Sequence, residues 1–266
     1  YKKIYVALLS LVQSAITFWL ELSGKTEVTP DFYLYIDKFS IIMSSIIAVV
    51  GCLICVYAVG YMKSYHSHHK EYKDRSPMFF SLLFVFIGAM FGIVFSNNLI
   101  WLFFFWDITT LCSFLLIGYT KTKEAITNSF RALWMNLIGG LCFALAIAYS
   151  AIKFGTLSLH DIIQMGGKDK FIIIPVILLC VAALTKSAQL PFSKWLLGAM
   201  VAPTPTSALL HSATMVKAGV YLLIRLSPLL VGNIAGVMVT TVGGFTFLAA
   251  SLIAISQSDG KKVLAY

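Results

Sequence analysis

Long runs of apolar residues dominate this sequence and set the strongest limit on its fold. Of its 266 residues, 59% belong to the hydrophobic set and only 12% are charged, whereas soluble domains are about half apolar and a quarter charged. A helix that crosses a membrane needs about 20 consecutive apolar residues. The composition therefore excludes a soluble single-core protein and leaves no room for a separate soluble catalytic domain.

Eight apolar runs predict eight membrane crossings in an all-α, polytopic helix bundle within a lipid bilayer. The runs lie at about residues 3–22, 36–62, 77–96, 98–118, 129–152, 172–190, 204–225 and 230–256. The five cysteines all lie inside such runs and are read as small apolar residues. Cys52 and Cys55 have no further ligands at metal-binding spacing, so we expect no metal site in this chain.

The Lys and Arg residues in the loops and near the ends of the runs predict the orientation of the bundle, because cytoplasmic loops are enriched in them. One side carries twelve of these residues and the other six. The richer side holds Lys2, Lys3, Lys63, Lys70, Lys73, Arg75, Lys121, Lys123, Arg131, Lys194, Lys261 and Lys262, and the poorer side Lys25, Lys38, Lys153, Lys168, Lys170 and Arg225. We therefore expect the N-terminal end and loop 63–76 in the cytoplasm, beneath an inner or plasma membrane. Since a topology signal accounts for the net charge of +9, nucleic acid is not an expected partner.

A few ionisable residues lie at membrane depth, where a charge costs about 2.5–3.5 kcal/mol and marks function. Asp107 lies near the middle of its span, Lys186 follows a long apolar stretch, and Lys217 shares a span with His211. One acid, two lysines and a histidine are more ionisable groups than a single ion pair needs. The surplus predicts a proton relay of Asp107, Lys186, His211 and Lys217. The alternative is an Asp107–Lys186 ion pair that only holds two helices together.

Residues beside these groups are expected to support them. Pro191 follows Lys186 closely and interrupts the helix, which frees backbone carbonyls near the lysine and near Ser187. Interrupted helices at membrane depth are packed in protein or line wet cavities, and transporters use them as ion sites. In the next span, polar residues recur at every third position and predict a stripe that can hold a water chain: His211, Thr214 and Lys217. Ser187, Pro191 and Thr214 are therefore assigned supporting roles.

The segments that carry these residues resemble the core signature of the antiporter-like membrane subunits. The resemblance is strongest over Thr185-Lys186-Ser187-Ala188-Gln189-Leu190-Pro191-Phe192 and over residues 202–221, and it extends to Trp106-Asp107 and to residues 262–266. This superfamily comprises the pumping subunits of respiratory complex I, the Mrp-type cation/proton antiporters and the membrane-bound energy-converting hydrogenases. The similarity covers about residues 36–266.

The resemblance implies a bundle of about fourteen helices, built from two inverted five-helix repeats that each contain one broken helix. This chain is expected to hold about eight of them. Residues 1–76 form two N-terminal transmembrane helices and a cytoplasmic loop, 77–225 the first repeat, and 226–266 a linking helix and the start of the second repeat, whose remainder is missing. By the same resemblance, Asp107 takes a place usually held by Glu, Lys186 is the lysine of the broken helix, and His211 and Lys217 lead onward along a hydrophilic axis.

One short segment favours a branch within this superfamily. Mrp and complex I members usually read Trp-Leu-Pro-Asp-Ala-Met where this chain has Trp195-Leu196-Leu197-Gly198-Ala199-Met200, a form similar to the energy-converting [NiFe] hydrogenases. We therefore predict a proton- or sodium-translocating membrane subunit of a complex I-related hydrogenase complex.

Its partners are expected to be other membrane subunits and peripheral redox subunits. The NiFe centre and the iron–sulfur clusters belong in those partners, and this chain is expected to hold no cofactor and no redox or hydrolytic active site. The alternative is a subunit of an Mrp-type cation/proton antiporter or of a complex I NADH/quinone oxidoreductase. A membrane anchor whose charges only hold helices together is the remaining hypothesis.

Overall fold

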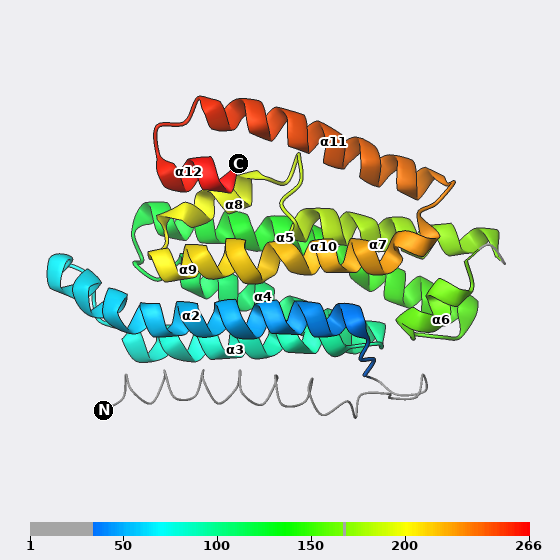
Figure 1. The fold of residues 1–266 in the computed structure, drawn as a ribbon, viewed down its shortest axis with the longest axis horizontal. Coiled ribbons are helices and arrows are strands. Elements are labelled where there is room, and N and C mark those ends of the chain that lie inside the picture. The colour runs from blue at the N-terminus through cyan, green and yellow to red at the C-terminus, as the bar shows by residue number, and fades with distance from the viewer. Residues whose placement is uncertain (1–33, 167–168) are drawn as a thin grey trace.

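The computed structural model describes residues 34–166 and 169–266 as an all-helical bundle (Figure 1). Six stretches of these residues are long and apolar enough to cross a membrane. They are α2 (Lys38–His68), α3 (Ser76–Phe95), α4 (Leu99–Ile117), α5 (Lys123–Phe154), Thr204–Leu229 and α11 (Ile234–Ile255). The predicted all-α membrane bundle is confirmed, and the expected span at 3–22 lies outside the described residues.

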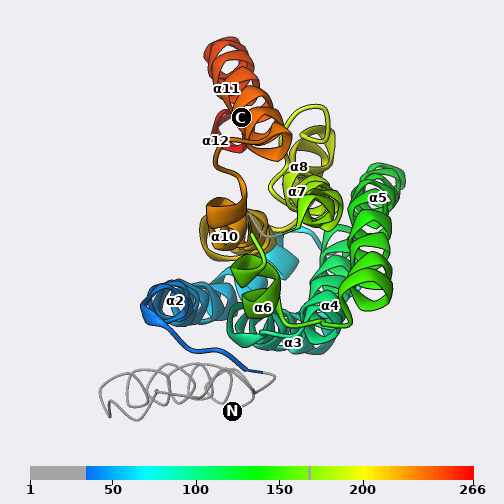
Figure 2. The same ribbon diagram turned by 90° about the vertical axis from the view of Figure 1, so that its right-hand side faces the viewer.

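Shorter helical pieces join the long ones. They are α6 (Leu159–Gln164), α7 (Ile173–Lys186), α8 (Lys194–Gly198), α9 (Thr204–Ala208), α10 (Met215–Leu226) and α12 (Gly260–Ala265). A π-helical turn, Leu209–Ala213, separates α9 from α10, and 3₁₀ turns cover Lys170–Ile172, Ala199–Val201 and Ser227–Leu229. Seen end-on in Figure 2, α2, α3, α4, α5 and α7 follow one another, α10 lies between α7 and α2, and α11 stands at the edge.

Four of the long helices begin where short polar side chains cap them. Asp37, Asn98, Thr122 and Asn233 each accept a hydrogen bond from a backbone N–H of the first turn, which satisfies donors that the helix itself leaves free. Helix α5 ends at Gly155, whose φ of 65° is the left-handed conformation that glycine adopts most easily. Polar residues between the apolar runs thus fix where four of the six membrane-length stretches start.

The structure differs from the predicted spans at the end of α2. The helix continues to His68, so the connecting loop is shorter than the predicted 63–76. His66 Nε2 lies 2.9 Å from the hydroxyl of buried Tyr119, and Tyr65 stacks against Tyr61 and Tyr72. These contacts hold the extra turns against the bundle, so part of the expected solvated loop is helix.

Candidate ion-translocation site

Lys186 is the last residue of α7 and is completely buried, with 0% of its surface exposed. Its Nζ donates to the backbone carbonyl of Trp106 at 2.9 Å and to Thr110 Oγ1 at 2.7 Å, and it lies 5.0 Å from the centre of the Trp106 ring. An ammonium group has three donors, and the described residues accept two of them. The third donor of this buried cation is therefore available to water or to a proton acceptor.

Two glycines allow the neighbouring helices to approach Lys186 closely. A Cβ on Gly139 of α5 would lie 1.9 Å from Thr185 Oγ1, and a Cβ on Gly219 of α10 would lie 2.4 Å from the carbonyl oxygen of Ala183. Both distances are far below van der Waals contact, so any larger residue would force neighbouring atoms of α7 to move. The close packing of α5, α7 and α10 excludes lipid from the end of α7.

Asp107 lies beside this lysine but does not pair with it directly. Among the described residues, ion pairs within 4.0 Å join His66 to Asp74, His69 to Glu71 and Arg225 to Asp37, and none includes Asp107. Lys186 Nζ hydrogen-bonds to Trp106 O and Thr110 on one face of α4. Successive residues of an α-helix point about 100° apart. The carboxylate of Asp107 faces α5 instead, where a Cβ on Gly140 would lie 3.6 Å from its Oδ1.

The interruption predicted from Pro191 is present, and α7 ends at Lys186. The segment between α7 and α8 is held by specific contacts. Trp195 Nε1 donates to Thr185 O at 2.9 Å, the Leu190 N–H donates to Thr246 Oγ1 on α11 at 3.0 Å, and Gln189 Nε2 donates to Ser187 O at 3.3 Å. Free carbonyls at a broken helix end thus find partners within the protein.

A cavity of about 340 Å³ adjoins this break. Ser187 and Gln189 from the break line it together with His211 from the π-helical turn and Thr246 and Ala250 from α11. The Nε2 atom of His211 is buried and has no hydrogen-bond partner among the described residues. Since a water molecule takes about 30 Å³ and needs polar partners, the cavity is roomy and polar enough for several waters. Ser187, which follows Lys186 in the chain, thus connects the lysine's helix end to the cavity beside His211.

The remaining predicted residues are placed differently from the expected regular stripe. The π-helical turn and the backbone of Thr214, at φ −133° and ψ −90°, interrupt the helix between His211 and Lys217. Thr214 is buried, and its hydroxyl donates to the carbonyl of Leu209. Lys217 has no hydrogen-bond or ion-pair partner among the described residues. The structure therefore brings Ser187 and His211 to one cavity but does not bring Lys217 to it.

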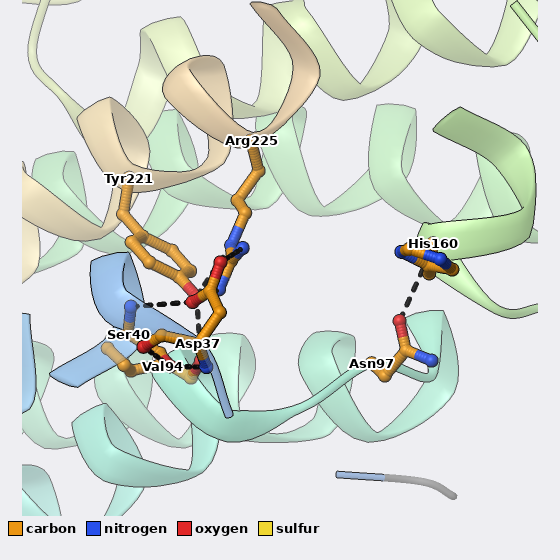
Figure 3. Close-up of polar contacts among 7 residues, drawn as sticks. All are labelled: Asp37, Ser40, Val94, Asn97, His160, Tyr221 and Arg225. Atoms are coloured by element: carbon orange, nitrogen blue, oxygen red, sulfur yellow. Dashed lines mark hydrogen bonds and ion pairs between the residues drawn. The ribbon is translucent and has the colours of Figure 1, made fainter. Parts of the chain in front are cut away.

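Residue spacing does not indicate a second polar cluster, which lies at the C-terminal end of α10 (Figure 3). Arg225 of α10 pairs with Asp37, the residue that caps α2, through Nη1–Oδ2 at 2.6 Å and Nη2–Oδ1 at 2.7 Å. Its Nε donates to the Tyr221 hydroxyl at 2.8 Å, and that hydroxyl donates to Val94 O at 2.7 Å. Burial opposes ionisation of Asp37, yet the hydrogen bonds from Arg225 and Ser40 hold its pKa below the usual 3.8. Arg225 was counted only as a loop charge, because a pairing across 188 residues leaves no local pattern.

Replacing Asp37 with Asn tests this cluster. Asn caps helices as well as Asp does, so D37N removes the ion pair and keeps the cap. We expect the free energy of unfolding to fall by about 1.5–3 kcal/mol, the usual contribution of hydrogen bonds to a charged group. Because the folded pKa is lowered, this stabilisation is present above pH 3.8 and is lost as the pH falls below that value through the lowered pKa.

Thermal unfolding at neutral pH measures the effect. The matched control is Asp259→Asn, which changes the residue that caps α12, whose described contacts include no basic side chain. Equal melting temperatures for the two variants would contradict a stabilising Asp37–Arg225 pair.

Fold and signature residues together define an antiporter-like membrane subunit, and comparison with known proteins identifies its family. The family model described as NADH:quinone oxidoreductase/Mrp antiporter, TM, matches residues 96–266, and that of the complex I chain 5 N-terminus matches residues 19–73. The chain belongs to the NADH:quinone oxidoreductase/Mrp antiporter family.

Relatives of known name are similar over nearly the whole chain. The Na(+)/H(+) antiporter subunit A1 of Staphylococcus haemolyticus is 38% identical over 267 residues, which is 98% of this chain and 32% of that protein. The subunit of the same name from Staphylococcus aureus is 36% identical, over 99% of this chain and 33% of its own length. This chain therefore spans about a third of the length of these relatives.

Two solved structures share the fold. The Mrp complex from Dietzia sp. DQ12-45-1b contains a chain that matches with a TM-score of 0.87 and 29% identity, over 100% of this chain and 30% of that one. The archaeal membrane-bound sulfane sulfur reductase, a respiratory membrane complex, matches with a TM-score of 0.86 and 21% identity, over 99% of this chain and 56% of that one. The second match shows a common fold alone.

Proposed function

We propose that this chain is the ion-translocating part of a subunit of an Mrp-type cation/proton antiporter. The observation that carries the proposal is the fully buried Lys186 at the broken end of α7, held by Trp106 O and Thr110, beside a polar cavity that includes His211. A buried cation with an unused donor next to such a cavity is suited to passing a proton. Relatives that are named Na(+)/H(+) antiporter subunits support the same assignment.

In this proposal, Lys186 holds the proton and exchanges it with His211 through water in the cavity. Asp107, one residue beyond the carbonyl that binds Lys186, supplies the nearby negative charge. Ser187 and Pro191 shape the break, Thr214 fixes the start of α10, and Lys217 carries the path further. The transported cation meets this path in the assembled complex, whose other membrane subunits are the proposed partners. The N-terminal end and the loop after α2 are assigned to the cytoplasm.

The hydrogenase branch favoured by residues 195–200 is the second candidate. The relatives support the Mrp alternative better, because the named sequence relatives are antiporter subunits. The shared fold with a respiratory membrane complex keeps a redox-driven assembly as the competing hypothesis. In that case a NiFe centre and iron–sulfur clusters lie in peripheral partner subunits.

Ion exchange by the purified native complex in proteoliposomes distinguishes the two. We expect an imposed sodium gradient to drive proton movement in the opposite direction, with no electron donor present. Proton movement that requires hydrogen, together with hydrogen-dependent reduction of an electron acceptor, would replace the antiporter assignment with the hydrogenase one. Liposomes that carry the complex with Lys186→Ala provide the control for leakage.

A further inference from the structure

A groove opens where the ends of α3, α4 and α5 meet, and the proposed ion path does not use it. These three helices lie side by side in Figure 2, and each is long and apolar enough to cross a membrane. The groove has a volume of about 390 Å³. It lies at the N-terminal ends of α3 and α5 and at the C-terminal end of α4. The positive-inside rule assigns this end of the bundle to the cytoplasm.

Apolar side chains form most of the wall of this groove. All three helices contribute them: Met78, Phe114, Leu115, Ile126 and Phe130. All but Phe114 are exposed, and the Phe114 ring packs edge to face against the Phe130 ring with 5.1 Å between their centres. Because lipid tails are as apolar as such side chains, the wall suits an acyl chain.

Two positive charges stand at the same groove. Arg75 precedes α3, and its Nη1 donates to Tyr119 O at 3.4 Å, which uses one of the five donors of the guanidinium. Lys121 is exposed in the turn between α4 and α5. Neither side chain forms an ion pair within the part of the chain that the structure describes. The described residues that line the groove include no acid, so its charge favours an anion.

The surrounding contacts leave both cations directed to the groove. Asp74, which precedes Arg75, is engaged elsewhere, because its Oδ1 accepts from Ser76 Oγ at 2.5 Å and lies 3.4 Å from His66 Nε2. Lys121 has a φ of 56°, a left-handed conformation that is uncommon outside glycine. Its backbone N–H donates to Gly118 O at 3.1 Å, which closes the turn after α4.

We propose that this groove binds an anionic phospholipid, with the headgroup phosphate at Arg75 and Lys121 and an acyl chain along Phe114 and Phe130. A guanidinium binds phosphate through two parallel hydrogen bonds, and an ammonium binds it as a point charge. Basic pockets between transmembrane helices on the cytoplasmic side bind anionic headgroups. A zwitterionic lipid carries its own cation beside the phosphate, so the groove selects the anionic one. The proposal goes beyond ion transport and holds whether or not Lys186 carries a proton.

Photo-crosslinking of lipids to the assembled membrane complex tests the site. The complex is placed in phosphatidylcholine vesicles with increasing fractions of phosphatidylglycerol that carries a diazirine in its acyl chain. Mass spectrometry measures crosslinks to the peptides that contain Phe114 and Phe130, and phosphatidylcholine with the same diazirine chain provides the comparison. The variant Arg75→Gln with Lys121→Gln removes both charges from the groove. Its matched control is Lys123→Gln with Arg131→Gln, which removes two exposed charges from the start of α5 outside the groove.

We expect phosphatidylglycerol to label the groove peptides of the parent saturably and more strongly than phosphatidylcholine does. One basic side chain near a membrane surface strengthens anionic binding about fivefold, so the double variant should need about 30-fold more phosphatidylglycerol for half-saturation. Equal labelling by the two lipids, parental half-saturation of the double variant or an equal shift in the control would overturn the site. Absence of crosslinks in the groove peptides would overturn it too, because another subunit would then cover the groove.

Lys121→Gln alone keeps the test valid if the double variant does not assemble. Its side chain is exposed and forms no hydrogen bond among the described residues, so we expect an intact complex with about fivefold weaker labelling. Parental labelling of this variant would contradict a phosphate site at Lys121.

Discussion

Replacing Lys186 with Ala is expected to lower proton transport by about 100-fold or more, the contribution typical of a positioned proton-transfer group. The side chain is fully buried and supplies the ammonium that Trp106 O and Thr110 bind. The hydrogen bonds that this change removes go to two neutral acceptors, so the helices around them are expected to assemble. Initial rates in proteoliposomes, normalised to the amount of intact complex, give the measurement.

Lys194→Ala is the matched control for this variant. Lys194 begins α8, a few residues beyond the break, and its side chain is exposed. The comparison therefore sets the loss of an exposed positive charge, that of Lys194, against the loss of the buried positive charge of Lys186. Transport at the parental rate by an intact K186A complex would mean that the lysine only holds helices together.

Gly219→Ala is expected to destabilise the protein by about 1–3 kcal/mol, the usual cost of overpacking a tight interior. The added Cβ would lie 2.4 Å from Ala183 O and 2.8 Å from the backbone nitrogen of Ser187. Both atoms belong to the backbone at the end of α7, so they cannot turn aside as a flexible side chain can. Separation of α10 from α7 also disturbs the break, and we expect slower transport together with a lower melting temperature.

Gly243→Ala serves as the control for the change from glycine to alanine within a helix. No atom lies within 4 Å of a Cβ at Gly243. Because alanine favours helix by about 1 kcal/mol over glycine, this variant is expected to be neutral or slightly more stable. Equal stability of the two variants would show that α7 and α10 are not packed as closely as described.

Much of the architecture was predictable from the sequence, because long apolar runs and the polar residues between them report helix spans directly. The break after Lys186 was also predictable, since proline cannot continue a helix hydrogen-bond ladder. The regular stripe through His211, Thr214 and Lys217 assumed an uninterrupted helix. Packing in the folded protein instead produces a π-helical turn, which residue spacing alone does not reveal.

The contacts of the site depend on atoms that a sequence pattern does not show. Lys186 binds the backbone carbonyl of Trp106, which any residue at that position would supply, and the hydroxyl of Thr110. The sequence drew attention to Asp107 because an acid in an apolar run is conspicuous, whereas Thr110 is not. The roles of Asp107, His211 and Lys217 in a relay stay predictions.

The central claim is that protons pass between Lys186 and His211 through the cavity beside the helix break. Filling this cavity tests the claim most directly. Ala250 of α11 lines this cavity, whereas its neighbour Ala249 does not. We predict that Ala250→Leu, by displacing the water that joins the two groups, removes most of the proton transport of an intact complex and that Ala249→Leu leaves it unchanged. Parental transport by the A250L complex would contradict the account.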